Sequence, residues 1–137
     1  MWKLFAVLSA LFAALTAILA KVGIQGIDSN LATAIRCVVI IIFVWGIVFW
    51  NGAVGQIPAL SMKNWTFLIL SGFATGLSWI FYFRALQLGD ASKVSAVDKL
   101  SVAFAIILAI LILREPADPK VLAGGALIVL GSLIIIW

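Results

Sequence analysis

Five stretches of about 20 mostly apolar residues follow one another along this chain, joined by short connections. They cover residues 2–21, 31–50, 65–88, 91–114 and 119–137. A helix of about 20 apolar residues is long enough to cross the roughly 30 Å hydrocarbon core of a bilayer. The sequence therefore predicts an all-α polytopic membrane protein, a bundle of five transmembrane helices that forms a single domain over residues 1–137.

The composition supports this class and excludes several others. Charged residues make up only 10% of the chain, against about 25% in a typical soluble domain, so the lipid bilayer must act as solvent for most of the surface. The chain has no histidine and only one cysteine, Cys37, which we interpret as a packing residue. A His/Cys metal cluster, a Cys-His nucleophile pair and an intrachain disulfide are therefore excluded, and we expect neither enzyme activity nor a cofactor. The cations are scattered, so nucleic acid is not an expected partner.

The helix boundaries carry their own signals. Lys3 before an apolar run could imitate a signal peptide, but the run reaches Ala20 and further spans follow, so we expect an uncleaved first helix. Capping residues or helix stops are found at Asp28, Ser61, Gly89, Asp90 and Asp118-Pro119. The connection 51–63 is apolar but interrupted by glycine and proline, and we expect it to lie at the membrane interface.

An odd number of spans places the two termini on opposite faces of the membrane. The N-terminal face is flanked by Lys3, Lys63, Arg114 and Lys120, and the other face by Lys21 and Lys93, with Arg36, Arg84 and Lys99 within reach of it. The positive-inside rule places the face richer in Lys and Arg in the cytoplasm, and here the numbers of cations on the two faces differ little. A single orientation with the N-terminus inside and insertion in both orientations both remain open.

The fourth segment carries polar residues in its first three turns. With Ser95 at zero on a helical wheel, Ser92 and Lys99 fall near +60° and +40°, and Asp98 falls near −60°. Aspartate is too short to reach the headgroups from there, so Asp98 must be protonated, paired or hydrated. Two interpretations remain: a structural ion pair with Lys99, Arg36 or Arg84, or a carboxylate whose protonation couples to transport, with Arg36 as its counter-ion.

The third segment carries a second polar stripe. Ser71, Thr75, Ser78 and Tyr82 are spaced by four, three and four residues, which places them on one helix face. Gly72 and Gly76 beside them form a GxxxG pattern, which allows helices to approach closely. Packing is the simpler interpretation, and a substrate-lining face, with Trp79 as a stacking surface, is the alternative.

The fifth segment has no charge but several glycines, namely Gly124, Gly125 and Gly131. Small residues of this kind favour close contact with a neighbouring helix or with a second copy of the chain. Plain contact with lipid is the alternative.

Three short runs lie at the end of the third segment, inside the fourth and at the end of the fourth: Tyr82-Phe-Arg-Ala-Leu-Gln-Leu-Gly-Asp-Ala-Ser-Lys-Val, Asp98-Lys-Leu-Ser and Leu113-Arg-Glu-Pro. They resemble the EamA family of the drug/metabolite transporter superfamily. In that family a Tyr-x-x-Ala-Leu-like helix end leads into a small-residue turn, and the next helix ends in a Leu-Gly-Glu-like motif. Arg36 matches an arginine common in the family, whereas Arg114 stands where glycine is common and Ser101 stands near a common proline.

The resemblance implies a secondary transporter of a small organic solute or metabolite in a bacterial or archaeal plasma (inner) membrane. Typical members carry two such repeats of inverted topology, and this chain holds one, so the resemblance implies a dimer, an antiparallel homodimer if the copies insert in opposite directions. It would work by alternating access, and coupling to protons is one option for its energy source. A non-transporting membrane subunit and a component of a lipid-linked substrate flippase are the alternatives. The predicted substrate and coupling residues are Asp98, Tyr82, Trp79, Ser78, Thr75, Arg36 and Lys99.

Overall fold

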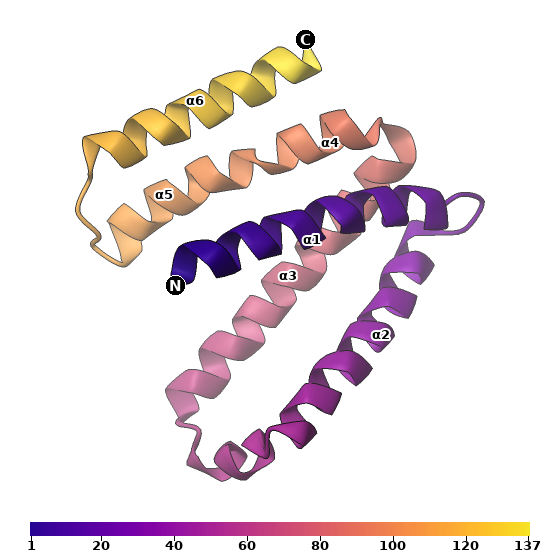
Figure 1. Ribbon diagram of the computed structural model, residues 1–137, viewed down its shortest axis with the longest axis vertical. Coiled ribbons are helices and arrows are strands. Elements are labelled where there is room, and N and C mark those ends of the chain that lie inside the picture. The colour runs from indigo at the N-terminus through magenta and orange to yellow at the C-terminus, as the bar shows by residue number, and fades with distance from the viewer. The chain divides into compact units, whose positions relative to one another are not determined.

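The computed structural model describes all residues, 1–137, and contains helices but no strand (Figure 1). The elements are α1 (Trp2–Gly23), α2 (Ser29–Trp50), the 3₁₀ helix η1 (Ala53–Ala59), α3 (Met62–Leu88), α4 (Ala91–Asp98), α5 (Leu100–Ile112) and α6 (Pro119–Ile136). Five helical segments are long and apolar enough to cross a membrane, and α4 and α5 together form the fourth, Ala91–Ile112. The predicted all-α, five-span fold is confirmed.

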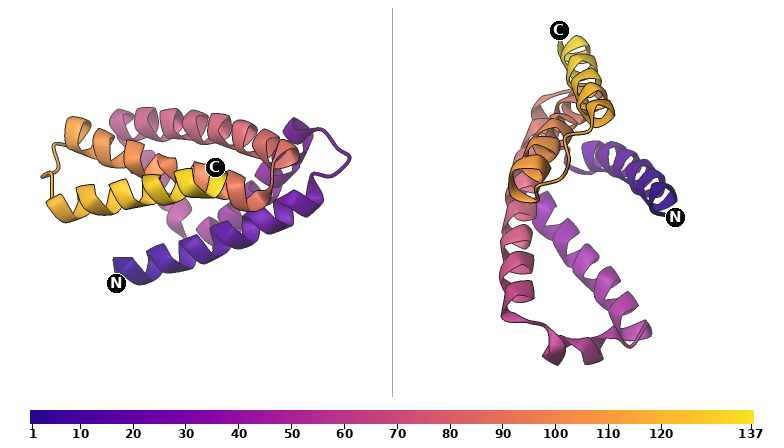
Figure 2. Two further views of the ribbon diagram at one scale, coloured as in Figure 1. Left: turned by 90° about the horizontal axis from the view of Figure 1, so that it is seen from above. Right: turned by 90° about the vertical axis from the view of Figure 1, so that its left-hand side faces the viewer.

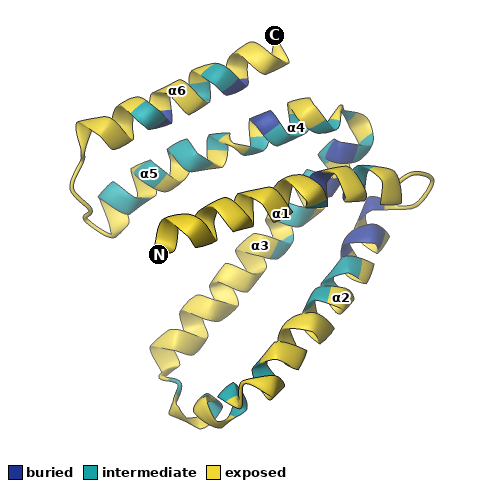
Figure 3. Cartoon of the chain, in the orientation of Figure 1, coloured by how far each residue is buried: buried dark blue, intermediate teal, exposed yellow.

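The apolar side chains of these spans are mostly exposed. In each span at most 11% of an apolar 18-residue stretch is buried within the chain, and exposed residues cover most of every long helix (Figure 3). In water such a surface would be strongly unfavourable, because each Å² of exposed apolar surface costs about 25 cal/mol. The exposed surface therefore belongs against lipid or against further membrane protein.

Several predicted caps are confirmed. The Asp28 carboxylate accepts hydrogen bonds from the backbone N–H groups of Asn30 and Leu31, at 2.9 and 3.1 Å. The Asp118 carboxylate accepts one from the N–H of Lys120 at 2.9 Å, and Pro119 opens α6. Ser61 Oγ accepts from the N–H of Asn64, and α3 accordingly begins at Met62, earlier than the expected residue 65.

The fourth span differs from the uninterrupted helix 91–114 that the sequence predicts. It is interrupted at Lys99 and ends at Ile112. At the interruption the N–H of Lys99 donates to Ala96 O and the N–H of Val102 donates to Lys99 O, which are bonds across three residues, not four. This is a local 3₁₀ turn inside an α-helix. Neither proline nor glycine occurs between residues 90 and 115, so the usual sequence signal for a break is absent.

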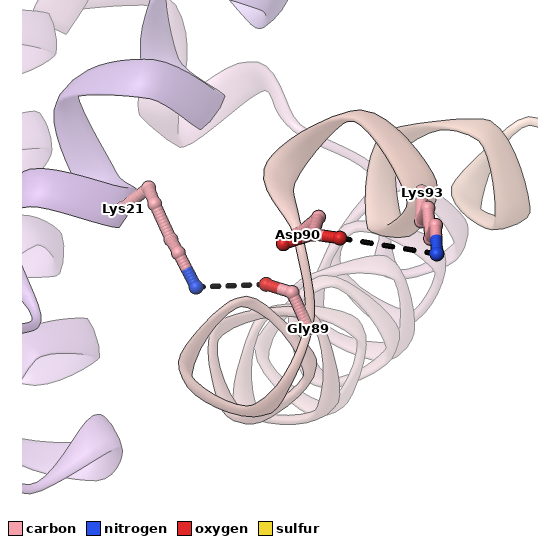
Figure 4. A network of polar contacts seen from close by, with 4 residues as sticks. All are labelled: Lys21, Gly89, Asp90 and Lys93. Atoms are coloured by element: carbon pink, nitrogen blue, oxygen red, sulfur yellow. Dashed lines mark hydrogen bonds and ion pairs between the residues drawn. The ribbon is translucent and has the colours of Figure 1, made fainter.

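The chain divides into two compact units. The first comprises residues 1–21 and 88–137. In it α6 packs along both α4 and α5, which lie beside it in each view (Figures 1 and 2). Lys21 at the end of α1 donates from Nζ to the carbonyl of Gly89 at 2.7 Å, which ties α1 to the turn before α4 (Figure 4).

The second unit, residues 22–87, consists of α2, η1 and α3. At one end Gln87 Nε2 donates to the carbonyl of Ile27 at 2.7 Å, which joins the end of α3 to the loop before α2. The buried residues of this unit all come from that end: Ile24, Ser29, Ala32, Thr33, Phe83 and Leu86. At the other end Gly52 adopts φ 67°, a left-handed conformation that favours glycine, and it turns the chain into η1.

Candidate functional site

Asp98 and Lys99 lie where the fourth span is interrupted. Asp98 is the last residue of α4, about 10 Å along the span from Ala91 at 1.5 Å per residue. Its carboxylate Oδ2 lies 3.3 Å from Lys99 Nζ, and the two side chains are 38% and 55% exposed. Of the three cations that the sequence offered as partners of Asp98, the structure pairs it with Lys99, its neighbour in the chain. Charged groups and an irregular backbone thus coincide inside an otherwise apolar segment.

Irregular backbone at membrane depth is found where it is buried in protein or lines a water-filled cavity, since lipid cannot satisfy its polar groups. The same holds for ionisable side chains, which mark ion and substrate pathways. The position of Asp98 and Lys99 is therefore suited to binding a proton or a polar solute.

Arg36 forms a second centre, within the unit of residues 22–87. It is half-buried on α2, and its guanidinium carbon lies 5.3 Å from the centroid of the Trp79 ring and 4.5 Å from that of Phe83. Both distances fall within the roughly 6 Å over which a cation is attracted to an aromatic face. Trp79 and Phe83 are four residues apart on α3, so their side chains share one helix face.

The remaining predicted lining residues lie on α3. Tyr82 packs edge-on against Phe83, with ring centroids 5.9 Å apart. Thr75 Oγ1 donates to the carbonyl of Ser71 at 2.9 Å, so its hydroxyl hydrogen is already used within the helix. Ser78 is exposed. Of the predicted site residues, Arg36 and Trp79 come together in one unit, and Asp98 and Lys99 come together in the other.

Phe83 was not among the predicted site residues, although it is fully buried and contacts Arg36. A signal for it existed in the sequence. Trp79, Tyr82, Phe83 and Leu86 follow the i, i+3, i+4, i+7 spacing of a packed helix face. The site prediction instead followed the neighbouring polar stripe of serines and threonine, and Phe83 was therefore left out.

The glycines predicted to mediate packing fall into two groups. A Cβ atom placed on Gly125 would lie 2.7 Å from Ile106 Cδ1, so Gly125 allows α6 to approach α5 closely. Gly72, Gly76, Gly124 and Gly131 have open space at the same position. Gly72 and Gly76 line a shallow apolar groove on α3 together with Ile69, Phe73, Leu77 and Ile80.

No group of three or more His, Cys, Asp or Glu side chains is placed to hold a metal ion.

Comparison with known proteins adds to these observations. The sequence model of the EamA-like transporter family matches residues 1–137. A protein from Sinorhizobium sp described as "Uncharacterized transporter in cobO 3'region" is 46% identical over 134 residues, which cover 98% of this chain and 95% of the relative. No solved structure matches.

The family match agrees with the five apolar helices and with the motifs around Tyr82 and Leu113, and it confirms the resemblance drawn from them. Together with the transporter-named relative, it identifies an integral membrane protein of a transport family. The chain belongs to the EamA-like transporter family.

Proposed function

We propose that the protein is a secondary transporter of a small organic solute, which works as a dimer by alternating access around a polar centre inside the membrane. The observation that carries this proposal is the charged pair Asp98–Lys99 at the interruption of the fourth span. Interrupted helices with polar groups near the middle of the bilayer form the binding sites of many secondary transporters. The bacterial source of the relative favours a plasma membrane location.

Asp98 would couple the solute to protons. A carboxylate inside a span can exchange its partner Lys99 for a proton, and the charge of the site then changes by one unit. A solute that binds one charge state better than the other shifts the equilibrium between them, which links solute binding to proton binding.

The dimer would be antiparallel. The 137 residues hold one five-helix repeat, and the cations are divided almost evenly between the two faces, which is compatible with insertion in both directions. The open groove over Gly72 and Gly76 offers a close-packing surface for a helix of the second copy.

The test uses the purified full-length chain in lipid vesicles that contain a pH-sensitive dye. A panel of small organic cations, anions and neutral solutes is added, and proton flux across the membrane is recorded. We expect flux that depends on at least one class of solute. Asp98→Asn should abolish this flux, because the asparagine amide does not take up a proton near neutral pH.

The matched control is Asp90→Asn. Asp90 lies at the start of the same span, is largely exposed and pairs with Lys93 at 3.9 Å (Figure 4). This variant should retain the flux. Wild-type vesicles that stay closed to every solute and to a proton gradient would refute the transporter.

A non-transporting membrane subunit is the second candidate, and the open GxxxG groove favours it. Such a subunit would tolerate Asp98→Asn but would lose assembly with Gly72→Leu or Gly76→Leu. Cross-linking of the native membrane before and after these substitutions separates the two functions, because a transporter should lose flux with Asp98→Asn while it remains assembled.

A further inference from the structure

Arg36 has a cationic group inside the membrane but no anionic partner in its own unit. Its guanidinium rests on the faces of Trp79 and Phe83, and no hydrogen bond joins its N–H groups to a protein acceptor. Aromatic faces attract the charge of a guanidinium but leave its edge of five N–H donors without acceptors. An arginine within a span normally pairs with an acceptor group, so we expect an anion to bind Arg36.

The donors of Arg36 are accessible. Every buried side-chain nitrogen or oxygen in the protein has a hydrogen-bond partner. Since the guanidinium nitrogens have none, they are not buried within the chain. The rings of Trp79 and Phe83 lie against the guanidinium and restrict its position.

The acids of the chain are largely committed elsewhere. Asp28, the sole acid among residues 22–87, caps α2 about 12 Å along the helix from Arg36. Asp118 caps α6. Asp90 pairs with Lys93, and Asp98 pairs with Lys99. Glu115, the fifth acid, follows the opposite end of the fourth span from Asp90.

We propose that Arg36, held by Trp79 and Phe83, binds the carboxylate of the transported solute, so that the substrate class is small organic anions. This inference rests on the transport function proposed above and names its substrate. A guanidinium that stacks on rings presents a fixed planar fork, which matches the two oxygens of a carboxylate. A charge pair inside a membrane-spanning segment is stronger than one in bulk water, because the effective dielectric constant is lower, and this favours capture of anions over neutral analogues.

Binding is tested on the full chain purified in a neutral detergent, without any gradient. The probes are benzoate and its neutral analogue benzamide, and the readout is tryptophan fluorescence, to which Trp79 contributes. We expect saturable quenching by benzoate and at least tenfold weaker binding of benzamide. Arg36→Gln should weaken benzoate binding about 10- to 100-fold, the range for a charged hydrogen-bonded contact. Arg36→Lys should lie between, because it keeps the charge but loses the fork.

Arg84→Gln is the matched control, since Arg84 is exposed on the same unit and donates to Gln87 at 3.0 Å. It should bind benzoate as the wild type does. Equal binding of benzoate and benzamide by the wild type would overturn the inference, and this comparison needs no variant to fold. Unchanged benzoate affinity in both Arg36 variants would overturn it as well.

Two further arms separate competing anions. If Asp98 filled the site as the counter-ion of Arg36, Arg36→Gln would weaken benzoate binding only when Asp98 is also replaced by Asn, whereas we expect the loss with Asp98 in place as well. If a lipid headgroup filled the site, phosphatidylglycerol added to the micelles would abolish benzoate binding at a lower concentration than benzoate itself needs. Because no gradient is present, anion binding without flux would refute the transporter alone, and flux of cations or neutral solutes without anion binding would refute this inference alone.

Discussion

At the scale of single residues, Arg114 is the position where side chain and backbone conflict. It adopts φ 56°, the left-handed region, and is the only residue other than glycine to do so. A residue with a Cβ atom is disfavoured there by about 1–2 kcal/mol, whereas glycine is not. The resemblance to the EamA family already placed Arg114 where glycine is common, and the backbone gives the physical reason for that preference.

Arg114→Gly should therefore stabilise the protein by about 1 kcal/mol relative to Arg114→Ala, because both remove the charge and only glycine relieves the backbone. The measurement is the unfolding midpoint of both variants in the same detergent. Equal midpoints would show that the left-handed turn is absent or costs nothing.

At the scale of helices, the contact between α5 and α6 depends on Gly125. Its missing side chain leaves room for the Ile106 terminal methyl group. Gly125→Ala should cost little, because that methyl group can move, whereas Gly125→Leu should destabilise by about 1–3 kcal/mol through overpacking. Gly124→Leu is the matched control, since nothing lies within 4 Å of a Cβ placed there.

The measurement is the unfolding midpoint of each variant in the same detergent. Ile106→Ala in the Gly125→Leu background should restore part of the lost stability, because it makes room for the leucine side chain. If Gly124→Leu and Gly125→Leu were equally harmful, lipid-facing or intermolecular contacts would dominate over the α5–α6 contact.

The interruption at Lys99 should be visible as local weakness in the fourth span. Bonds of 3₁₀ type have poorer geometry than α-helical ones, so the amides of Lys99 and Val102 should exchange with solvent faster than those in the middle of α5. The double variant Asp98→Ala/Lys99→Ala should raise their protection, because alanine is the best helix former. Hydrogen exchange followed by mass spectrometry measures this, and uniform protection along the wild-type span would contradict it.

The sequence predicted the helices better than it predicted the site. Asp28, Ser61 and Asp118 act through local hydrogen bonds, so their positions as caps could be read directly from the chain. The interruption at Lys99 has no proline or glycine to announce it. The contact of Arg36 with Phe83 joins residues 47 positions apart, which helical periodicity within one segment does not specify.

At the scale of the whole molecule, the balance of charge between the two faces determines how the chain inserts. With the cations so evenly divided, the orientation should respond to small changes in Lys and Arg near the ends of the spans. Single cysteines at either terminus in a Cys37→Ser background, labelled from each side of the membrane, report the orientation. We expect each terminus to be labelled from both sides, and labelling of each from one side only would exclude an antiparallel homodimer.

The charge argument can also be tested by forcing one orientation. Three lysines added in the loop at residues 51–61 should place every N-terminus in the cytoplasm, because this loop shares the face of Lys3 and Lys63. If two opposite orientations are required, this variant should lose solute-dependent flux although it folds. Three glutamates in the same places are the control, since acidic residues have little effect on orientation, and flux should persist.

Co-expression with a second variant that carries three added lysines beside Lys21 should restore flux, because the two chains then insert in opposite directions. Full flux from the first lysine variant alone would show that one orientation is sufficient, and the antiparallel dimer would be abandoned.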